Sequence, residues 1–230
     1  MRVTRTRNGL RLSQHGVVIS ELRTTPGPTH SVFDVLAAVA VGLRPAGRVG
    51  MLGFAGGGMM APLAALGFAT RIAAVDRDRA AFSLFRRHCP HWAGQVRWHH
   101  GDAVAWLRRQ RGKFDLLIED LSIPQAGDVV KPAVSWTELP RLVRRRLGAR
   151  GVALFNLLPP PAGRFADALT HVAAEFPVAR VVVLEEFENR LLLAGRELPA
   201  AGELARVLGD RLEQLGSRQA GRIRVRTWRR

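Results

Sequence analysis

The segment from Arg48 to Asp76 constrains the fold more than any other part of the chain. Val49 to Leu52 reads as a short apolar strand, a glycine-rich turn follows, and a helix over Met59 to Leu66 leads to a second strand, Ile72 to Val75. Glycine has no Cβ, so such a turn can approach a ligand closely, and the helix N-terminus offers unpaired N–H groups. Asp76, about 20 residues after the turn, stands where nucleotide-binding βαβ units hold a ribose. The segment therefore predicts a nucleoside-cofactor site.

The spacing of the glycines bears on which nucleoside is bound. Gly53, Ala55, Gly57 and Gly58 form a G-x-A-x-G-G turn, whereas a pyrophosphate-binding turn follows the pattern G-x-G-x-x-G. The order in this chain is closer to the loop that surrounds the amino-acid tail of S-adenosylmethionine. Taken alone, the turn is also compatible with an ordinary tight connection between a strand and a helix.

Strands and helices continue to alternate through the middle of the chain. The pattern predicts five further strands: Val96–His99, Phe114–Glu119, Val152–Phe155, Ala179–Leu184 and Arg190–Ala194. Helices separate the earlier strands, and the last two are expected to pair with each other. The order predicts an α/β fold with a doubly wound, mostly parallel, seven-stranded sheet.

Ligands of doubly wound sheets bind at the carboxyl ends of the strands. Gly53, Asp76, Asp102 and Asp120 each stand at, or just after, the end of one of four successive predicted strands. Asp102 also opens a predicted helix and is expected to cap it in part. We therefore expect these residues to converge on one cleft.

The two ends of the chain are predicted to form smaller elements around this unit. Residues 1–28 read as a β-hairpin element with turns at Asn8-Gly9 and His15-Gly16. Residues 29–197 form the Rossmann-like domain, and residues 198–230 form a C-terminal helix and a basic tail. The hairpin element is a candidate homodimer contact because a two-stranded element is rarely stable alone.

The chain is strongly basic, with a formal net charge of +16. Such a charge suggests a polyanionic partner such as a nucleic acid. Nearly all of the positive charge is arginine, however, and the arginines are scattered over predicted helix surfaces, where a solvated face explains them equally well. Nucleic acid is therefore a possibility that rests on charge alone, with the basic tail as the expected contact.

Other classes of protein are disfavoured by composition. No apolar run approaches the roughly 18 residues that a membrane span needs, and the N-terminal MRVTRTRNG lacks the apolar core of a signal peptide, so we expect a cytoplasmic protein without a membrane partner. The single cysteine, Cys89, fits that compartment. Four histidines, His88, His91, His99 and His100, lie near it in the sequence, but without paired C-x-x-C spacing we expect no metal site.

Four motifs in order resemble the spermidine synthase-like group of class I S-adenosylmethionine-dependent transferases. They are VGMLGFAGGGMM, AAVDRD, GDAVAWL and DLLIEDLSIP, and the late segment FPVARVVVLEEFENRLLLAG is similar to the final hairpin of the methyltransferases in that group. The resemblance covers roughly residues 29–195. It implies a Rossmann-like fold that binds S-adenosylmethionine or its decarboxylated form.

The resemblance also implies roles for individual residues. Asp76 would bind the ribose hydroxyls and Asp102 the adenine amino group, while Asp120 would face the transfer centre as the catalytic residue. The expected cofactor-binding set is Gly53, Ala55, Gly56, Gly57, Gly58, Asp76, Arg77, Asp102 and Ala103, and the expected substrate-binding residues are His30 and Ser122. From the residues alone, Asp120 could instead cap a helix or pair with an arginine.

Departures from the family pattern bear on the reaction. Polyamine aminopropyltransferases carry an aspartate where this chain has Gly56, and their D-x-x-D-P motif reads Asp120-Leu-Ser-Ile-Pro124 here, with one acid instead of two. The chain also has no tyrosine to frame a polyamine. The favoured prediction is a methyltransferase acting on an amine, a protein or a small molecule. The alternatives are an aminopropyltransferase that uses decarboxylated S-adenosylmethionine and a non-catalytic nucleoside-binding protein.

Overall fold

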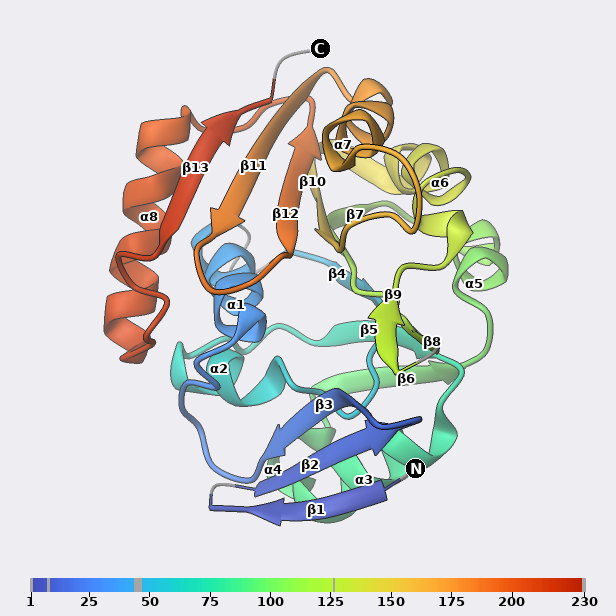
Figure 1. The fold of residues 1–230 in the computed structure, drawn as a ribbon, viewed down its shortest axis with the longest axis vertical. Coiled ribbons are helices and arrows are strands. Elements are labelled where there is room, and N and C mark those ends of the chain that lie inside the picture. Colours follow the sequence, from blue (N-terminus) through green and yellow to red (C-terminus); the bar gives the residue numbers. More distant parts are fainter. Residues whose placement is uncertain (1, 8, 44–46, 126, 229–230) are drawn as a thin grey trace.

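A twisted central sheet with helices on both faces forms the body of the molecule (Figure 1). The computed structural model describes residues 2–7, 9–43, 47–125 and 127–228. Within these residues the central sheet has eight strands in the order β13-β11-β12-β10-β7-β4-β5-β6. Their bounds are β4 Val49–Leu52, β5 Ile72–Asp76, β6 Val96–His100, β7 Phe114–Glu119, β10 Leu147–Leu157, β11 Val178–Leu184, β12 Arg190–Gly195 and β13 Ile223–Thr227.

The strand directions confirm the predicted doubly wound, mostly parallel sheet. Strands β6, β5, β4, β7 and β10 pair in parallel in that order, while β12 and β13 each pair antiparallel with their neighbours. All seven predicted strands form, within a few residues at their ends. The eighth strand, β13, comes from the basic tail, where the charged residues hid a two-residue alternation: Ile223 and Val225 are half-buried, and Arg224 and Arg226 are exposed.

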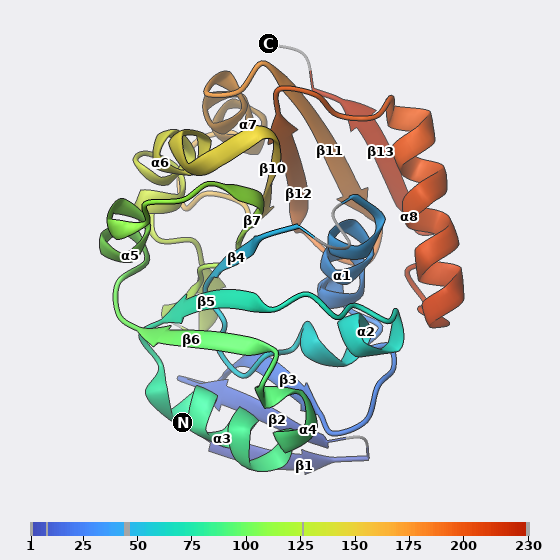
Figure 2. The same ribbon diagram turned by 180° about the vertical axis from the view of Figure 1, so that it is seen from behind.

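Two helical layers enclose separate apolar cores (Figure 2). One core is built with α1 Val32–Leu43, α2 Met60–Ala65, α3 Arg79–His88, α4 Pro90–Ala93 and α8 Ala201–Leu215. The other is built with α5 Ala103–Arg109, α6 Leu139–Arg146 and α7 Phe165–Ala174. Because both faces of the parallel strands are covered, β4 is buried at all four positions. No helix in the described part of the chain is long and apolar enough to cross a bilayer.

The first residues form a three-stranded antiparallel sheet of β1 Arg2–Thr6, β2 Gly9–Gln14 and β3 Val17–Arg23. The predicted turn at His15-Gly16 is confirmed, with both residues at positive φ. The predicted Asn8-Gly9 turn includes Asn8, which lies outside the described residues. This sheet is not a free appendage: Leu10, Leu12 and Leu22 are buried in the same core as the glycine turn.

The C-terminal segment is tied to the start of the Rossmann-like domain by a buried carboxylate. Asp34 in the first turn of α1 is fully buried and accepts hydrogen bonds from Thr29 N (2.7 Å), Thr29 Oγ1 (2.7 Å), His30 N (2.9 Å) and Ser217 Oγ (2.6 Å). Four donors satisfy the charge that burial would otherwise penalise. Ser217 follows α8 directly, so this contact joins residues at opposite ends of the sequence.

Candidate cofactor and acceptor site

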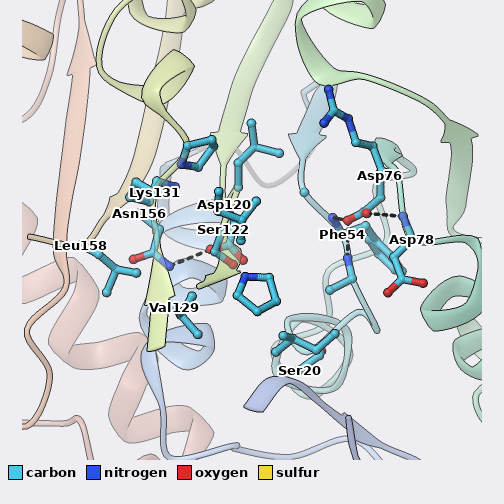
Figure 3. Close-up of a pocket in the computed structure, with 18 of the residues that line it drawn as sticks. Ser20, Phe54, Asp76, Asp78, Asp120, Ser122, Val129, Lys131, Asn156 and Leu158 are labelled. Atoms are coloured by element: carbon cyan, nitrogen blue, oxygen red, sulfur yellow. Dashed lines mark hydrogen bonds between the residues drawn. The ribbon is translucent and has the colours of Figure 1, made fainter. Parts of the chain in front are cut away.

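One large cavity, of about 1030 Å³, opens at the carboxyl ends of β4, β5 and β7 (Figure 3). Gly53, Asp76, Asp102 and Asp120 all line it. In Figure 3, Asp76, Asp78 and Phe54 lie on one side, and Asp120, Ser122 and Asn156 on the other. The predicted convergence of the three aspartates and the first glycine of the turn is therefore observed.

The glycine turn contributes only its first residues to the cavity wall. Gly53, Phe54 and Ala55 line the cavity, and both Gly53 (φ 86°) and Ala55 (φ 44°) have positive φ. The amide of Gly53 donates to the carbonyl of Val75 (3.0 Å), which holds the turn against β5.

The other three glycines, predicted to bind the cofactor, face protein atoms. A Cβ on Gly56 would meet Leu22 at 2.5 Å and Leu12 at 2.7 Å, so its surface is covered by the N-terminal sheet. A Cβ on Gly57 would meet the Phe54 ring at 2.8 Å, and one on Gly58 the Phe33 ring at 2.7 Å. None of the three lines the cavity. These glycines allow close packing of the turn against its surroundings.

Asp76 fixes the shape of the turn as well as lining the cavity. Its Oδ2 accepts from the amides of Phe54 (2.6 Å) and Ala55 (2.7 Å), and its Oδ1 accepts from the amide of Asp78 (2.7 Å). A carboxylate offers about four lone-pair positions. Three are used by the backbone, which leaves capacity for a donor that enters the cavity.

Asp102 has the predicted capping role and an ion-pair partner. Its Oδ1 accepts from the amide of Ala105 (2.8 Å) at the start of α5, and its Oδ2 pairs with Arg77. The Ala105 amide, and with it the Arg77 guanidinium, lowers the pKa of the Asp102 carboxyl. Arg77, Asp102 and Ala103 all line the cavity, so the predicted cofactor residues on this side lie together.

Asp120 faces the same cavity from the end of β7. Its removal from water raises the pKa of the carboxyl to about 6, although the Lys131 charge and a hydrogen bond from Asn156 oppose that shift. Asn156 Nδ2 donates to Asp120 Oδ1 at 2.7 Å, and Asn189 Nδ2 donates to Asn156 Oδ1 at 2.8 Å. This amide chain leaves Oδ2 of Asp120 for a ligand. A carboxyl with a pKa near neutrality can exchange a proton under ordinary conditions.

Behind Asp120 lies a buried ion pair that the sequence analysis did not identify. Glu119 Oε1 accepts from Lys131 Nζ (2.8 Å), Ser135 Oγ (2.9 Å) and the amide of Leu121 (3.1 Å). The side chains of Glu119 and Lys131 are each 1% exposed. Adjacent strand residues point to opposite faces, so Glu119 holds the loop while Asp120 faces the cavity.

The two predicted substrate-binding residues differ in position. Ser122 lines the cavity beyond Asp120. His30 is not among the lining residues; its Nδ1 accepts from the amide of Arg218 (3.3 Å), and its carbonyl accepts from Gln219 Nε2 (3.3 Å). The backbone of His30 has φ 58°, which directs the side chain to the C-terminal segment. The adjacent Ser31, Val32 and Phe33 line the cavity instead.

Three further segments of the cavity wall were missed by sequence reasoning. The N-terminal sheet supplies residues from β2 and β3, including Gln14 and Ser20. A short hairpin of β8 Ile123–Gln125 and β9 Asp128–Val130 forms a second wall. The loop before β12 supplies Phe187 and Asn189. Only the hairpin had a usable signal, because Ala126-Gly127-Asp128 is a turn sequence between two short apolar stretches.

Two tryptophan side chains near β6 pack against phenylalanine rings. Trp98 stacks on Phe82 with ring centroids 4.4 Å apart, and Trp106 lies 5.9 Å from the Phe114 ring. Among the residues that the structure describes, no group of three or more His, Cys, Asp or Glu side chains is placed to hold a metal ion.

Gly53→Ala is expected to abolish nucleoside binding and to destabilise the fold. A Cβ at Gly53 would lie 2.5 Å from the carbonyl oxygen of Asp120, and its φ is 86°. Gly67→Ala is the matched control: φ is 72°, but no described heavy atom lies within 4 Å of the added Cβ. The control should lose only the roughly 1–2 kcal/mol of a left-handed alanine. Thermal unfolding and calorimetry on both variants would measure this, and equal losses in the two would contradict the close-packing argument.

Comparison with known proteins finds similar solved structures but no similar sequence family. No protein-family model matches the chain, and no curated protein matches it. The fold is the Rossmann-like one that spermidine synthases and class I methyltransferases share. A probable spermidine synthase from Corynebacterium glutamicum has a TM-score of 0.75 at 18% identity, over 98% of this chain and 86% of that one.

Two structures with bound ligands are also similar. Human methyltransferase-like protein 13 in complex with SAH has a TM-score of 0.61 at 18% identity, over 82% of this chain and 92% of that one. A spermidine synthase in complex with the transition state analogue AdoDATO has a TM-score of 0.66 at 16% identity, over 86% of this chain and 74% of that one. At these identities the likeness establishes the fold.

Proposed function

We propose that this chain is an S-adenosylmethionine-dependent methyltransferase of the spermidine-synthase-like group, acting on an amine, a protein or a small molecule. The observation that carries the proposal is the single cavity in which Asp76 lies at one end and Asp120 at the other. Asp102 also lines this cavity and pairs with Arg77, the residue that follows Asp76. The remaining acceptor capacity of Asp76 suits a ribose hydroxyl. Arg77 and Ala103 complete the proposed nucleoside end.

The bound cofactor would supply a methyl carbon attached to a positively charged sulfur. Asp120 would hold the acceptor amine through Oδ2 and accept its proton, since its pKa of about 6 leaves it ionised at neutral pH. Asn156 would keep the carboxylate oriented, and the cavity walls would align the amine with the methyl carbon. Positioning of this kind can account for much of the rate of such a displacement.

The scarcity of acidic side chains near the acceptor favours methyl transfer over aminopropyl transfer. Gly56, which stands where aminopropyltransferases carry an aspartate, is covered by Leu12 and Leu22. Ile123 in the Leu-Ser-Ile-Pro segment supplies no charge. The alternative remains an aminopropyltransferase that uses decarboxylated S-adenosylmethionine, which the likeness to solved spermidine synthase structures supports.

Calorimetry with S-adenosylmethionine, its decarboxylated form and 5′-methylthioadenosine tests the proposal. We expect S-adenosylmethionine to bind most tightly. Asp76→Ala should weaken that binding about tenfold or more, because hydrogen bonds to a charged group contribute roughly 1.5–3 kcal/mol. Asp210→Ala, on the exposed side of α8, is the control and should bind normally. Preference for the decarboxylated form would establish the alternative, and binding without turnover over a panel of acceptors would indicate a non-catalytic nucleoside-binding protein.

We also propose a cellular location and two kinds of partner for this chain. The single cysteine, Cys89, is buried and its Sγ donates to the carbonyl of Arg23 (3.3 Å), which suits a reducing compartment, and we propose a cytoplasmic enzyme. A homodimer through the N-terminal sheet is proposed from β1, whose five residues are all exposed. A nucleic-acid partner remains a proposal from the net charge of +16.

A further inference from the structure

The half of the cavity beyond Asp120 has few charged groups. This acceptor half is the wall formed by the cavity-lining residues of segments 120–124 and 129–134 together with Asn156, Leu158, Phe187 and Asn189. Asp120 supplies its only carboxylate among the described lining residues. The apolar part of the wall consists of Leu121, Ile123, Val129, Val134, Leu158 and Phe187.

The polar groups of the acceptor half are neutral apart from Asp120 and Lys131. The charge of Lys131 is already paired with that of Glu119. Asn156 and Asn189 are hydrogen-bonded in series to Asp120. The Lys131 side chain is 1% exposed and paired with Glu119. One ammonium group could therefore pair with Asp120, but a second would meet no free carboxylate in this half. Glu21, which lines the cavity from β3, is already paired with Arg11 at 2.7 Å. An unpaired ammonium removed from water is costly.

The mouth of the cavity carries exposed apolar side chains on two separate elements. Val18 on β3 is 46% exposed and Ile123 on β8 is 45% exposed, and both line the cavity. They are two of only three large hydrophobic residues that are exposed in the described chain. Strand β3 contacts the β8–β9 hairpin. Apolar side chains that line a cavity give a ligand an apolar surface to lie against.

From these observations we infer that the acceptor is a small molecule with an apolar body and a single amine, and that the site rejects polyamines. The inference rests on the proposed methyltransferase function. The amine would pair with Asp120 while the body lies against Leu158 and Phe187 and extends towards Ile123.

Octylamine and 1,8-diaminooctane form the matched pair that tests this inference. They share an eight-carbon chain and differ only in whether the eighth carbon carries a hydrogen or an ammonium group. Titrated into protein saturated with S-adenosylhomocysteine, octylamine should bind at least about tenfold more tightly, because one unpaired ammonium is left in the apolar half. Across butylamine, hexylamine and octylamine, affinity should rise about fourfold per methylene, the factor that apolar transfer gives.

Leu158 offers a pair of variants that separates charge from shape. Leu158→Asp places a second carboxylate in the acceptor half and should raise diamine affinity about tenfold. Leu158→Asn introduces a neutral side chain of the same size as aspartate and should not raise it. Leu158 is half-buried, so both variants should fold. Ile123→Ser, at an exposed position, should weaken octylamine binding without changing the binding of S-adenosylhomocysteine.

Two results would overturn the inference. One is diamine binding equal to or tighter than that of octylamine in the unmodified protein, and the other is absence of octylamine binding at millimolar concentration. Binding of S-adenosylhomocysteine is measured first and by itself. Its failure would contradict the cofactor proposal, whereas the amine comparison tests only the acceptor class.

Discussion

Asp120→Asn is expected to reduce methyl transfer by about 10²- to 10⁴-fold, the range that general acid–base catalysis contributes. Asparagine keeps the shape of the side chain and can still accept the hydrogen bond from Asn156 Nδ2, which is 2.7 Å long in the native site. It cannot take a proton from the acceptor. Binding of S-adenosylhomocysteine, which depends on the other end of the cavity, should change less than about threefold, well below one kcal/mol. Single-turnover rates and calorimetry on the same preparations would measure both.

The pH dependence of the native enzyme gives an independent check on Asp120. Because its pKa is raised to about 6, kcat/KM should fall tenfold per pH unit below that value and level off above it. A profile with its midpoint near 4, the ordinary value for aspartate, would contradict the raised pKa of Asp120. Ser122→Ala, which changes a neighbour in the cavity lining, should leave the midpoint unchanged.

The same raised pKa predicts that Asp120→Asn, which lowers activity, increases the stability of the fold. Below the ordinary aspartate pKa of 3.8, Asp120 is protonated in both folded and unfolded chains; as pH rises through about 6, this favourable contribution to folding is lost. Asparagine mimics the protonated group at every pH. Asp120→Asn should therefore raise the free energy of unfolding at pH 8 by about 3 kcal/mol and have little effect at pH 4. A stabilised but inactive variant would exclude unfolding as the cause of lost activity, whereas destabilisation at pH 8 would contradict the raised pKa.

The fold could be predicted because its strongest signals are local. Val49–Leu52 and Phe114–Glu119 are short apolar runs bounded by turn residues, and the structure has both strands at those bounds. Asp76 is the last residue of β5, and Asp120 directly follows β7. The carboxyl ends of parallel strands meet at one edge of a sheet, so strand assignment alone brought these acids together.

Contacts between distant segments could not be predicted in this way. Gly56 has a place in a glycine-rich turn, but its surroundings are Leu12 and Leu22, more than 30 residues earlier in the chain. His30 carried a plausible family role, yet its ring accepts from Arg218 near the other end of the sequence. Hydrophobic periodicity contains no information about such partners. The cavity walls that determine the acceptor are built largely from contacts of this kind.

Lys131→Met is expected to destabilise the protein by about 3–5 kcal/mol, the cost of removing one partner from a buried ion pair. Glu119 would keep Ser135 and the Leu121 amide as donors, but its Oε2 already lacks a partner. The neighbouring oxygen would then also lose its cation inside the protein. Urea unfolding at pH 8 would measure the loss.

Two further variants test whether the buried, unpaired charge of Glu119 causes the loss of stability in Lys131→Met. The double variant Lys131→Met with Glu119→Gln removes both charges of this pair, so most of the lost stability should return. Arg206→Met breaks an ion pair with Asp210 in which the side chains are 68% and 62% exposed, and it should cost no more than about 0.5 kcal/mol. If the double variant were as unstable as the single one, the unpaired charge of Glu119 would not be the cause of the lost stability.

Lys131 should also affect catalysis without touching the acceptor. Its positive charge lowers the pKa of Asp120 against the larger effect of burial. Lys131→Met should therefore raise the pKa of Asp120 further, and the midpoint of the kcat/KM profile should move above 6. At pH 5, where Asp120 would be largely protonated, the variant should be slower than the native enzyme, and at pH 9 the two should approach each other. A lower rate that is independent of pH would instead indicate a general distortion of the site, and the charge of Lys131 would then have no part in holding Asp120 ready to accept a proton.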